Sequence, residues 1–303
     1  MKADFHIETD IKVCLSLWEK FSNDELPTDN WAYRFCFHKG YQSEPYFIVG
    51  KVKDTVIGFL PLEYDKKTKS YAFFGGGFGW NEQMRFVITE QFRKNYLNQF
   101  VAQIPQNSRL RYLHPDDVEL ITQKLIPEED PSYYLLPTEF NFDMEQYMAA
   151  FSPRSRKNLR KSVRRINDLN PKISEGNIAD IDFLVRYNIG AHKKESLFHD
   201  KYLTASFKNL LLEPSLKDHV KIVSVVIAGQ VESVSIYAVF KGTLTYLEGS
   251  SNLENQYVTR YLDYHIFAQA FEKKITMIDA LSGDCGWKER WRLKKQPLFE
   301  LVV

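Results

Sequence analysis

Glu248, Asp284 and Lys288 have the residue types that proton transfer and charge stabilisation require. Glu248 closes an apolar run with the character of a strand, and a carboxylate in that position could act as a general base. Asp284 could hold an ammonium group or take a proton from it, although Asp beside Gly commonly bonds its own backbone in a turn. Lys288 could hold a phosphate or offset charge on an attacked carbonyl oxygen. The alternative for Lys288 is a solvated surface lysine.

A glycine-rich stretch, FFGGGFGW at residues 73–80, follows a segment with strand character. It has neither the Gly-Lys-Ser/Thr of a Walker loop nor the spacing of a dinucleotide fingerprint. Because glycine lets a backbone approach a ligand closely, we predict substrate contacts from Gly76, Phe78 and Trp80. Trp287, next to the candidate lysine, is predicted to contact substrate as well. A tight loop plugged by aromatic side chains is the alternative for the glycine-rich stretch.

The segment SPRSRKNLRKSVRRI, residues 152–166, carries seven basic residues and no acidic one. Leu159, Val163 and Ile166 form an apolar stripe at helical spacing, and Ser-Pro is typical of a helix start. The pattern predicts an amphipathic helix over about 154–168, with a solvated face as the simplest explanation of its charges. We expect instead that it binds anions, with at least two side chains pointing into a cleft between domains. The candidates for phosphate contacts are Arg156, Lys157, Arg160 and Arg164.

Composition restricts the class of protein. The 303 residues are 44% hydrophobic and 26% charged, as in globular domains, and the length is comfortable for two of them. A net charge of +1 excludes an overall basic footprint, so any nucleic-acid surface must be local. No apolar window of about 18 residues predicts a membrane span, and the first ten residues do not resemble a signal peptide. Three widely spaced cysteines favour a reducing compartment, and we expect a cytoplasmic protein.

Metal binding is not expected from the histidines. His192 and His199 are seven residues apart and would share a helical face, but no third ligand accompanies them. The cysteines contain no Cys-x-x-Cys pair of the kind that zinc sites use.

Strand patterns occur twice, at residues 45–77 and 219–251, and the two segments superpose at an offset of 175 residues. Each predicts three strands joined by polar turns. Helical patterns follow at 82–101 and 257–273, and short apolar strands come after them. The repeated order predicts a duplicated mixed α/β domain, although any two α/β domains could produce similar patterns. We place the domains at 1–135 and 136–303, because prolines and acids interrupt the periodicity between them.

Three stretches carry a resemblance to the GNAT superfamily of acyltransferases, in particular to its Fem-type and CelD-like branch. They are the basic segment 151–166, the segment 246–280 with its strand, loop, helix and strand, and IDALSGDCGWKERW at 278–291. The resemblance implies two tandem GNAT-like domains with a cleft between them. It also implies that the lysine of the terminal motif, Lys288, takes part in transfer. The sequence departs from the family at Tyr257-Val258-Thr259, where a small residue pair usually opens the acyl-binding helix.

The resemblance implies transfer of an acyl or aminoacyl group to an amine on a small molecule or peptide. The donor would be acetyl-CoA, another acyl-CoA or an aminoacyl-tRNA, with no metal ion. In the second domain, donor contacts are expected from Ser250, Gln256 and Tyr257. A bulky Tyr257 could block close approach of a pyrophosphate, which favours the alternative of a non-catalytic scaffold that binds tRNA or another polyanion. A third possibility is an enzyme that joins two small metabolites.

Overall fold

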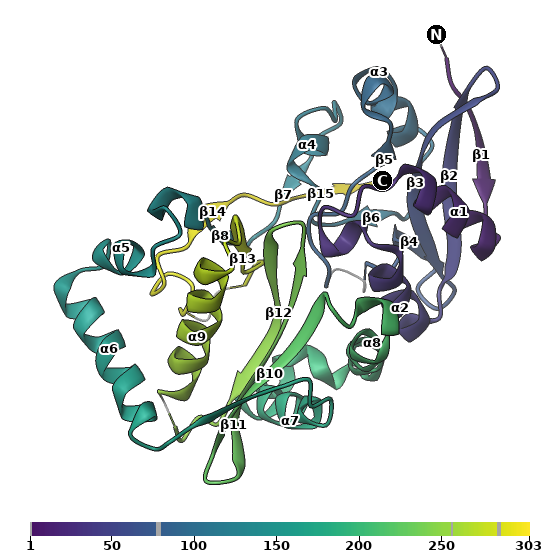
Figure 1. The fold of residues 1–303 in the computed structure, drawn as a ribbon. Coiled ribbons are helices and arrows are strands. Elements are labelled where there is room, and N and C mark those ends of the chain that lie inside the picture. The colour runs from purple at the N-terminus through teal and green to yellow at the C-terminus, as the bar shows by residue number, and fades with distance from the viewer. Residues whose placement is uncertain (1, 77–79, 256, 284–285) are drawn as a thin grey trace. The chain divides into compact units, whose positions relative to one another are not determined.

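The computed structural model describes residues 2–76, 80–255, 257–283 and 286–303. The chain divides into two compact units (Figure 1). The N-terminal unit contains residues 1–131 together with 297–303, and the C-terminal unit contains residues 132–296. These units are defined by compactness, so the boundary between folding domains that we predict between residues 135 and 136 stays a prediction. Within the described residues, no helix combines the length and apolar character needed to cross a membrane.

The N-terminal unit is a mixed α/β structure built on an antiparallel sheet in the order β1-β2-β3-β4, with β5 also paired to β3. Helices α1 and α2 connect β1 to β2, and α3 follows β5. The elements are β1 (Asp4–Glu8), α1 (Ile11–Phe21), α2 (Trp31–Tyr41), β2 (Glu44–Val52), β3 (Thr55–Asp65), β4 (Ser70–Phe73), β5 (Val87–Ile88), α3 (Glu90–Val101), β6 (Arg109–Leu110), α4 (Pro115–Val118) and β7 (Ile126–Pro127).

Local sequence explains the three central strands of this unit. A tight turn joins β2 to β3, and Lys53 adopts a positive φ of 55° there. Between β3 and β4, the carboxylate of Asp65 accepts hydrogen bonds from Lys67 N and Thr68 Oγ1, which closes the second turn. The meander predicted at residues 45–77 is therefore confirmed. Its apolar faces pack into two clusters of buried side chains, one against α3 and the other against α1 and α2.

The helix predicted over residues 82–101 is shorter than expected and begins at Glu90. Val87 and Ile88 pair with β3, and Met84 forms a parallel bridge with Leu113. Pairing with neighbouring strands bonds the backbone at Met84, Val87 and Ile88, so these apolar residues belong to extended segments and not to a helix.

The last seven residues belong to the N-terminal unit and not to the unit that precedes them in sequence. Strand β15 (Phe299–Val302) pairs antiparallel with β6 and with β7. Two ion pairs reinforce this arrangement, since Arg109 bonds Glu300 and Arg111 bonds Glu128.

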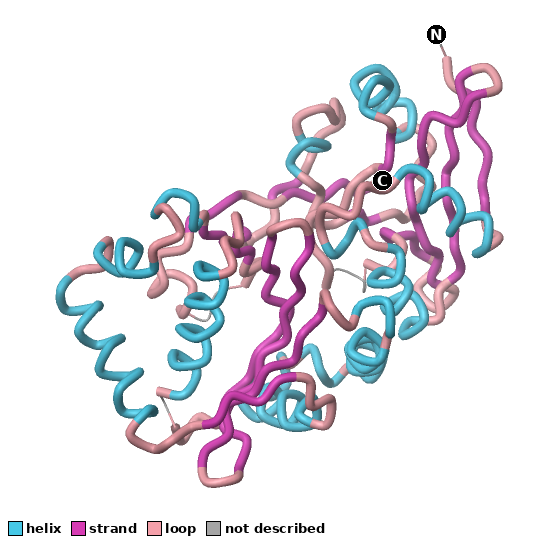
Figure 2. Tube along the Cα trace, viewed as in Figure 1, coloured by secondary structure: helices cyan, strands magenta, loops and turns pink. Residues whose placement is uncertain are grey.

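The C-terminal unit is built on a sheet of seven strands in the order β14-β8-β13-β12-β11-β10-β9. Helix α9 lies on one side of β10, β11 and β12, and α7 and α8 lie on the other (Figure 2). The elements are β8 (Ser132–Leu135), α5 (Met144–Ala149), α6 (Pro153–Asn167), β9 (Lys172–Glu175), α7 (Asp180–His192), α8 (Lys201–Leu212), β10 (Val220–Ile227), β11 (Gln230–Phe240), β12 (Thr243–Ser251), α9 (Val258–Glu272), β13 (Met277–Asp279) and β14 (Lys294–Gln296).

The basic segment forms α6, as its apolar stripe predicts. Ser152 caps the helix by accepting a hydrogen bond from Ser155 N at 3.2 Å, and Pro153 occupies the first helical position. Leu159 and Ile166 are buried in the core of the C-terminal unit, where α6 packs on α9. The cationic side chains therefore surround the rest of a helix whose apolar face is already covered.

Candidate functional site

An opening between two strands organises the candidate site in the C-terminal unit. Strands β12 and β13 pair in parallel at Thr243–Met277, Leu244–Ile278 and Thr245–Asp279. Beyond Thr245, β12 continues to Ser251 with β11 as its partner on one side, while β13 ends and its chain turns towards β8. The outer edge of β12 from residue 246 onward can therefore offer backbone hydrogen bonds to an extended ligand.

A bulge bends β12 where the strands separate. Ile236 pairs with Glu248 and the next residue, Tyr237, pairs with Tyr246, so Leu247 is an extra residue on β12. A bulge increases local twist and redirects neighbouring side chains. Here it precedes Glu248 directly, so it determines how that carboxylate leaves the strand.

Glu248 is a partly buried carboxylate with two hydrogen bonds to one of its oxygens. Its Oε1 accepts from Gly249 N at 2.9 Å and from Asn188 Nδ2 at 3.3 Å. Loss of solvation raises the pKa of Glu248 to about 7, and the Gly249 amide, Lys288 and Asn188 each act in the opposite direction. A carboxyl group that titrates near neutrality can take a proton from an ammonium group and release it again.

Lys288 is buried, with 3% of its surface exposed, so its ammonium is not a solvated surface group. Nζ donates hydrogen bonds to Leu281 O at 2.9 Å and to Ser282 O at 2.5 Å, in the turn that follows β13. The ammonium also lies 5.3 Å from the ring centre of Tyr133 and 5.7 Å from that of Trp287. The cation is thus held at the end of β13, within electrostatic range of Glu248.

Helix α9 begins beside the same opening with its first turn free of acidic residues. Its N-cap is Tyr257, which makes no side-chain capping bond. The guanidinium of Arg165 bonds the Tyr257 hydroxyl and stands 4.7 Å from its ring centre. Val258 N donates to Asn255 O, while the N–H groups of the rest of the first turn, the helix dipole and the nearby guanidinium together favour an anion. Among the other predicted donor contacts, Ser250 lies on β12, and Gln256 lies outside the described residues.

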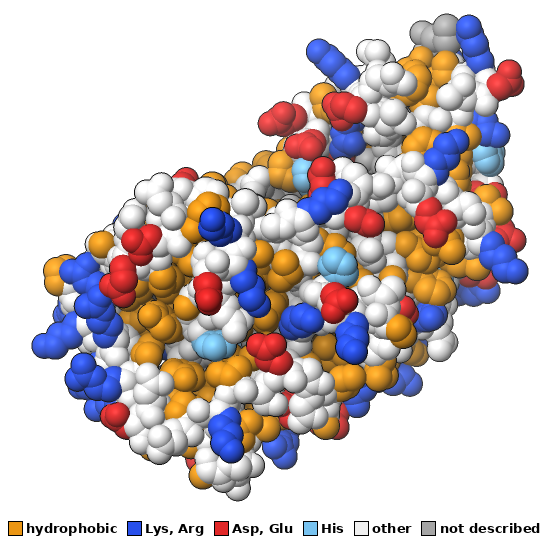
Figure 3. Space-filling model, in the orientation of Figure 1, with side chains coloured by type: hydrophobic (Ala, Val, Ile, Leu, Met, Phe, Trp, Pro, Cys, Tyr) orange, Lys and Arg blue, Asp and Glu red, His pale blue; other side chains and the backbone are white. Residues whose placement is uncertain are grey.

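The cationic face of α6 borders a pocket of about 210 Å³. Arg160, Val163, Arg164 and Asn167 of α6 line it together with Tyr264 of α9. Figure 3 shows Lys and Arg side chains gathered along the edge of the molecule where α6 runs.

The other predicted phosphate contacts of α6 lie outside the pocket lining. Arg156 donates to Ala149 O, while Lys157 is exposed. Arg160 does line the pocket, but it is paired with Glu145 at 2.6 Å, and this carboxylate partly offsets the positive charge of Arg160 there. The prediction that these side chains point into a cleft between domains stays a prediction.

The predicted substrate contacts fall in both units. Trp287 lies beside Lys288 and packs on Tyr246, with 5.7 Å between ring centres. Gly76 and Trp80 belong to the N-terminal unit, and Phe78 lies outside the described residues, as does the candidate Asp284. In that loop, Asn81 Nδ2 donates to Gly75 O and Asn81 Oδ1 accepts from the Tyr33 hydroxyl.

In the N-terminal unit, the corresponding strand position is closed by protein. Tyr71 bridges in parallel to Ser108, and Met84 bridges in parallel to Leu113. Twelve residues lie between Tyr71 and Met84, but only four lie between Ser108 and Leu113. Met84 N donates to Tyr112 O, and Met84 O accepts from His114 N. After the glycine-rich loop, the chain therefore returns to the sheet at Met84 and occupies this strand position.

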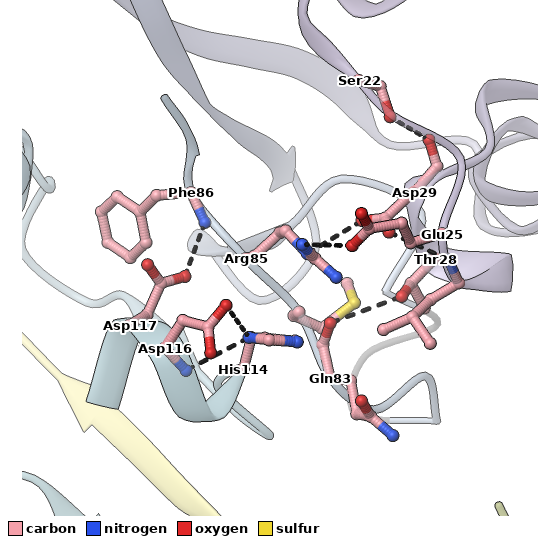
Figure 4. Close-up of polar contacts among 12 residues, drawn as sticks. Ser22, Glu25, Thr28, Asp29, Gln83, Arg85, Phe86, His114, Asp116 and Asp117 are labelled. Atoms are coloured by element: carbon pink, nitrogen blue, oxygen red, sulfur yellow. Dashed lines mark hydrogen bonds and ion pairs between the residues drawn. The ribbon is translucent and has the colours of Figure 1, made fainter. Parts of the chain in front are cut away.

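Polar contacts hold the returning segment in place (Figure 4). Arg85 pairs with Asp29 at 3.0 Å, and Phe86 N donates to the buried carboxylate of Asp117. Burial raises the pKa of Asp117 to about 7 even though Arg93 bonds it. Helix α3 then begins with Glu90, a residue that disfavours an anion at that helix end.

Two residues of the C-terminal site were not predicted from the sequence. Asn188 is sixty residues from Glu248 and carries no motif that would connect them. Asp263 is buried in α9, accepts from Trp291 Nε1 at 3.3 Å, and has its pKa raised to about 7 by burial. An acid at a core-facing helical position was the one available signal for Asp263.

Comparison with known proteins decides the family of this region. Residues 153–289 match the family model described as acetyltransferase (GNAT) domain. This segment is a GNAT-type acetyltransferase domain. It contains the β12–β13 opening, α9, Glu248 and Lys288. No curated protein matches the chain in sequence.

Solved structures share the fold over nearly the whole chain. FemX has a TM-score of 0.64 at 11% identity, covering 100% of this chain and 98% of its own. L-PGS from Bacillus licheniformis has a TM-score of 0.59 at 10% identity, with coverages of 97% and 92%. A tandem GNAT protein from the clavulanic acid biosynthesis pathway has a TM-score of 0.51 at 7% identity, with coverages of 99% and 98%. The predicted fold class, tandem GNAT-like units of mixed α/β structure, is confirmed.

The described residues contain no group of three or more His, Cys, Asp and Glu side chains that could hold a metal ion.

Proposed function

We propose that the C-terminal GNAT domain transfers an acyl group from a coenzyme A thioester to an amine. The observation that carries the proposal is the joint position of Glu248 and Lys288 at the opening between β12 and β13. A carboxylate that titrates near neutrality and a buried cation next to an unpaired strand edge fit the needs of acyl transfer.

The residues around the opening fit a thioester donor. The free edge of β12 can bond the amide groups of the pantetheine arm, and the first turn of α9 can receive the pyrophosphate with help from Arg165. We assign Ser250, Gln256 and Tyr257 to this donor site. The closed strand position and Glu90 in the N-terminal unit argue against donor binding there. We assign Gly76, Phe78 and Trp80 of that unit, together with Trp287, to acceptor contacts.

Proton transfer is the role proposed for Glu248. An amine arrives mostly as an ammonium and must lose a proton before its nitrogen can attack the thioester carbon. Glu248 accepts that proton, a C–N bond forms, and the C–S bond breaks to release the thiol. Asp284 is proposed to hold the incoming ammonium.

Charge stabilisation is the role proposed for Lys288. Attack of nitrogen on the carbonyl carbon moves negative charge to the carbonyl oxygen. A fixed cation near that oxygen stabilises the transition state more than the ground state. Its bonds to Leu281 O and Ser282 O keep the ammonium in place before reaction, so little reorganisation accompanies the step.

Glu248→Gln tests the proposal, with thiol release from acetyl-CoA measured against a panel of amines and amino sugars. The variant keeps the shape of the side chain but cannot accept a proton, so transfer should fall about 100-fold or more. Glu272→Gln, an exposed change at the opposite end of α9 from the proposed donor site, is the matched control and should retain activity. Equal activity of all three proteins would overturn the role of Glu248. Transfer from an aminoacyl-tRNA but not from acyl-CoA would replace the donor.

A second function, binding of tRNA or another polyanion without catalysis, is favoured by one observation. Six of the seven basic side chains of α6 are exposed, and among the described residues Arg160 alone of them has an ion-pair partner. Neutralised phosphates would make binding steeply salt-dependent. Fluorescence anisotropy with labelled tRNA at several salt concentrations separates the two functions, because tRNA binding without any thiol release would favour the second.

A further inference from the structure

The side chain of Glu248 is bound asymmetrically. Both of its hydrogen bonds, from Gly249 N and Asn188 Nδ2, go to Oε1. Among the residues that the structure describes, none donates a hydrogen bond to Oε2. One oxygen of the carboxylate is therefore held by two donors, and the other has no hydrogen-bond donor among the described residues.

The side chain of Asn188 is itself fixed by a second hydrogen bond. Its Oδ1 accepts a hydrogen bond from Ser196 Oγ at 2.7 Å, and both residues are buried. Ser196 caps the short 3-10 helix Leu197–His199, where its Oγ accepts from Phe198 N at 3.2 Å. A hydroxyl group has one proton, and here it is directed to Oδ1. This leaves the NH₂ group of Asn188 to face Glu248, the only orientation in which an ionised carboxylate is bonded and not repelled.

We propose that Asn188 is a positioning residue for the general base: held by Ser196, it fixes Oε1 of Glu248 and leaves Oε2 to take the proton from the acceptor ammonium. The proposal rests on the function proposed above, and it adds a chain from Ser196 through Asn188 to Glu248 that links α7 and its following loop to the bulge in β12. Rigid support of this kind keeps a catalytic group within reach of its proton.

The hydrogen bond from Asn188 should affect the pH range in which Glu248 accepts a proton. A donor that bonds a carboxylate stabilises its ionised form and lowers its pKa. Burial raises the pKa of Glu248, and the Gly249 amide, the Lys288 ammonium and Asn188 oppose that rise. Lys288, beyond β13, is the charged group that acts on Glu248, and α7 contributes the neutral Asn188. Loss of the Asn188 donor should therefore move the proton-accepting range of Glu248 to higher pH.

The experiment compares Asn188→Leu, which keeps the approximate shape, with Asn188→Asp, which places a second carboxylate beside Glu248. The acid limb of the profile of kcat/KM against pH should shift upward by about one pH unit in Asn188→Leu, the scale of one lost hydrogen bond to a charged group. The shift should be larger in Asn188→Asp, because like charges oppose ionisation. Ser196→Ala should shift the limb in the same direction by less. Asn177→Ala is the control, because its amide bonds Asp180 at the start of the same helix.

A second measurement does not depend on activity. Protein labelled with ¹³C at the glutamate carboxyl groups is titrated by NMR, and the Glu248 signal is identified by its loss in Glu248→Gln. An upward shift in Asn188→Leu, with none in Asn177→Ala, supports the positioning role. An unshifted Glu248 titration overturns it, even if the wild-type protein transfers acyl groups. A shifted titration in a protein without transfer activity leaves the positioning contact standing and overturns the proposed function.

Discussion

The ammonium of Lys288 lowers the pKa of Glu248 through space, although burial keeps that pKa at about 7. The two groups come from different strand ends, one after the bulge of β12 and the other attached to the turn after β13. A base and a cation that influence each other must be tested separately, because removing one alters the protonation of its partner.

Lys288→Met keeps the apolar stem and removes the charge. Transfer should fall about 100-fold or more, the scale of one lost oxyanion partner, while acetyl-CoA affinity changes little. The melting temperature should also fall, because Leu281 O and Ser282 O lose their donor. Lys295→Met is the control, since Lys295 is exposed and stands 5.5 Å from the same Tyr133 ring.

Kinetics and calorimetry distinguish the expected result for Lys288→Met from two other outcomes. Lost affinity with intact turnover of bound donor would make Lys288 a phosphate anchor. No change in either quantity would contradict any role in the site.

Thr259→Glu tests where the donor binds. Thr259 occupies the second position of α9 and is exposed, so a carboxylate there interacts favourably with the helix dipole and should not lower stability. It should nevertheless weaken acetyl-CoA binding at least about tenfold, because it would face the pyrophosphate. Isothermal titration calorimetry measures the affinity, and thermal melting checks the fold.

Gln91→Glu places a carboxylate at the same helical position of α3 in the N-terminal unit. Its acetyl-CoA affinity should equal that of the wild type. Weaker binding in Gln91→Glu and not in Thr259→Glu would move the donor site to the N-terminal unit.

The double variant Arg160→Gln, Arg164→Gln tests the pocket between α6 and α9. Both side chains are exposed, so the fold should be unaffected. An anionic ligand that uses the pocket should bind more weakly and with a flatter dependence on salt. Arg154→Gln, Lys157→Gln removes the same charge from the same helix outside the pocket lining. Equal effects of the two double variants would indicate a general cationic surface.

Asp263→Asn tests the pH dependence of stability. Burial raises the pKa of Asp263 from 3.8 to about 7, so the folded state binds this proton more tightly than the unfolded state. The contribution of Asp263 is therefore fully present below the unfolded pKa and is lost as pH rises through about 7. Asn resembles the protonated acid, so the variant should melt at least about 4 °C higher at pH 8 and nearly equally at pH 4. Asp182→Asn, an exposed change, should show no such difference.

A higher melting temperature of Asp263→Asn at pH 4 but not at pH 8 would reverse the sign and contradict the raised pKa. Thermal melts at both pH values decide between these outcomes.

The sequence by itself determined the local elements and the chemical character of the site. Turn residues between apolar runs predicted both meanders, since a short turn and alternating burial are properties of neighbouring residues. The stripe of Leu159, Val163 and Ile166 predicted α6 for the same reason. Side-chain chemistry and a family resemblance singled out Glu248 and Lys288 before any contact was known.

Tertiary structure alone decided what surrounds those residues. The burial of Lys288, the hydrogen bond from Asn188 to Glu248 and the pairing of β15 with β6 join segments far apart in the chain. The start of α3 at Glu90 was likewise decided by pairing with β3, which outweighed the helical pattern of the preceding residues. Burial, pKa and strand partners depend on which distant groups exclude water from a site, and local sequence does not contain that information.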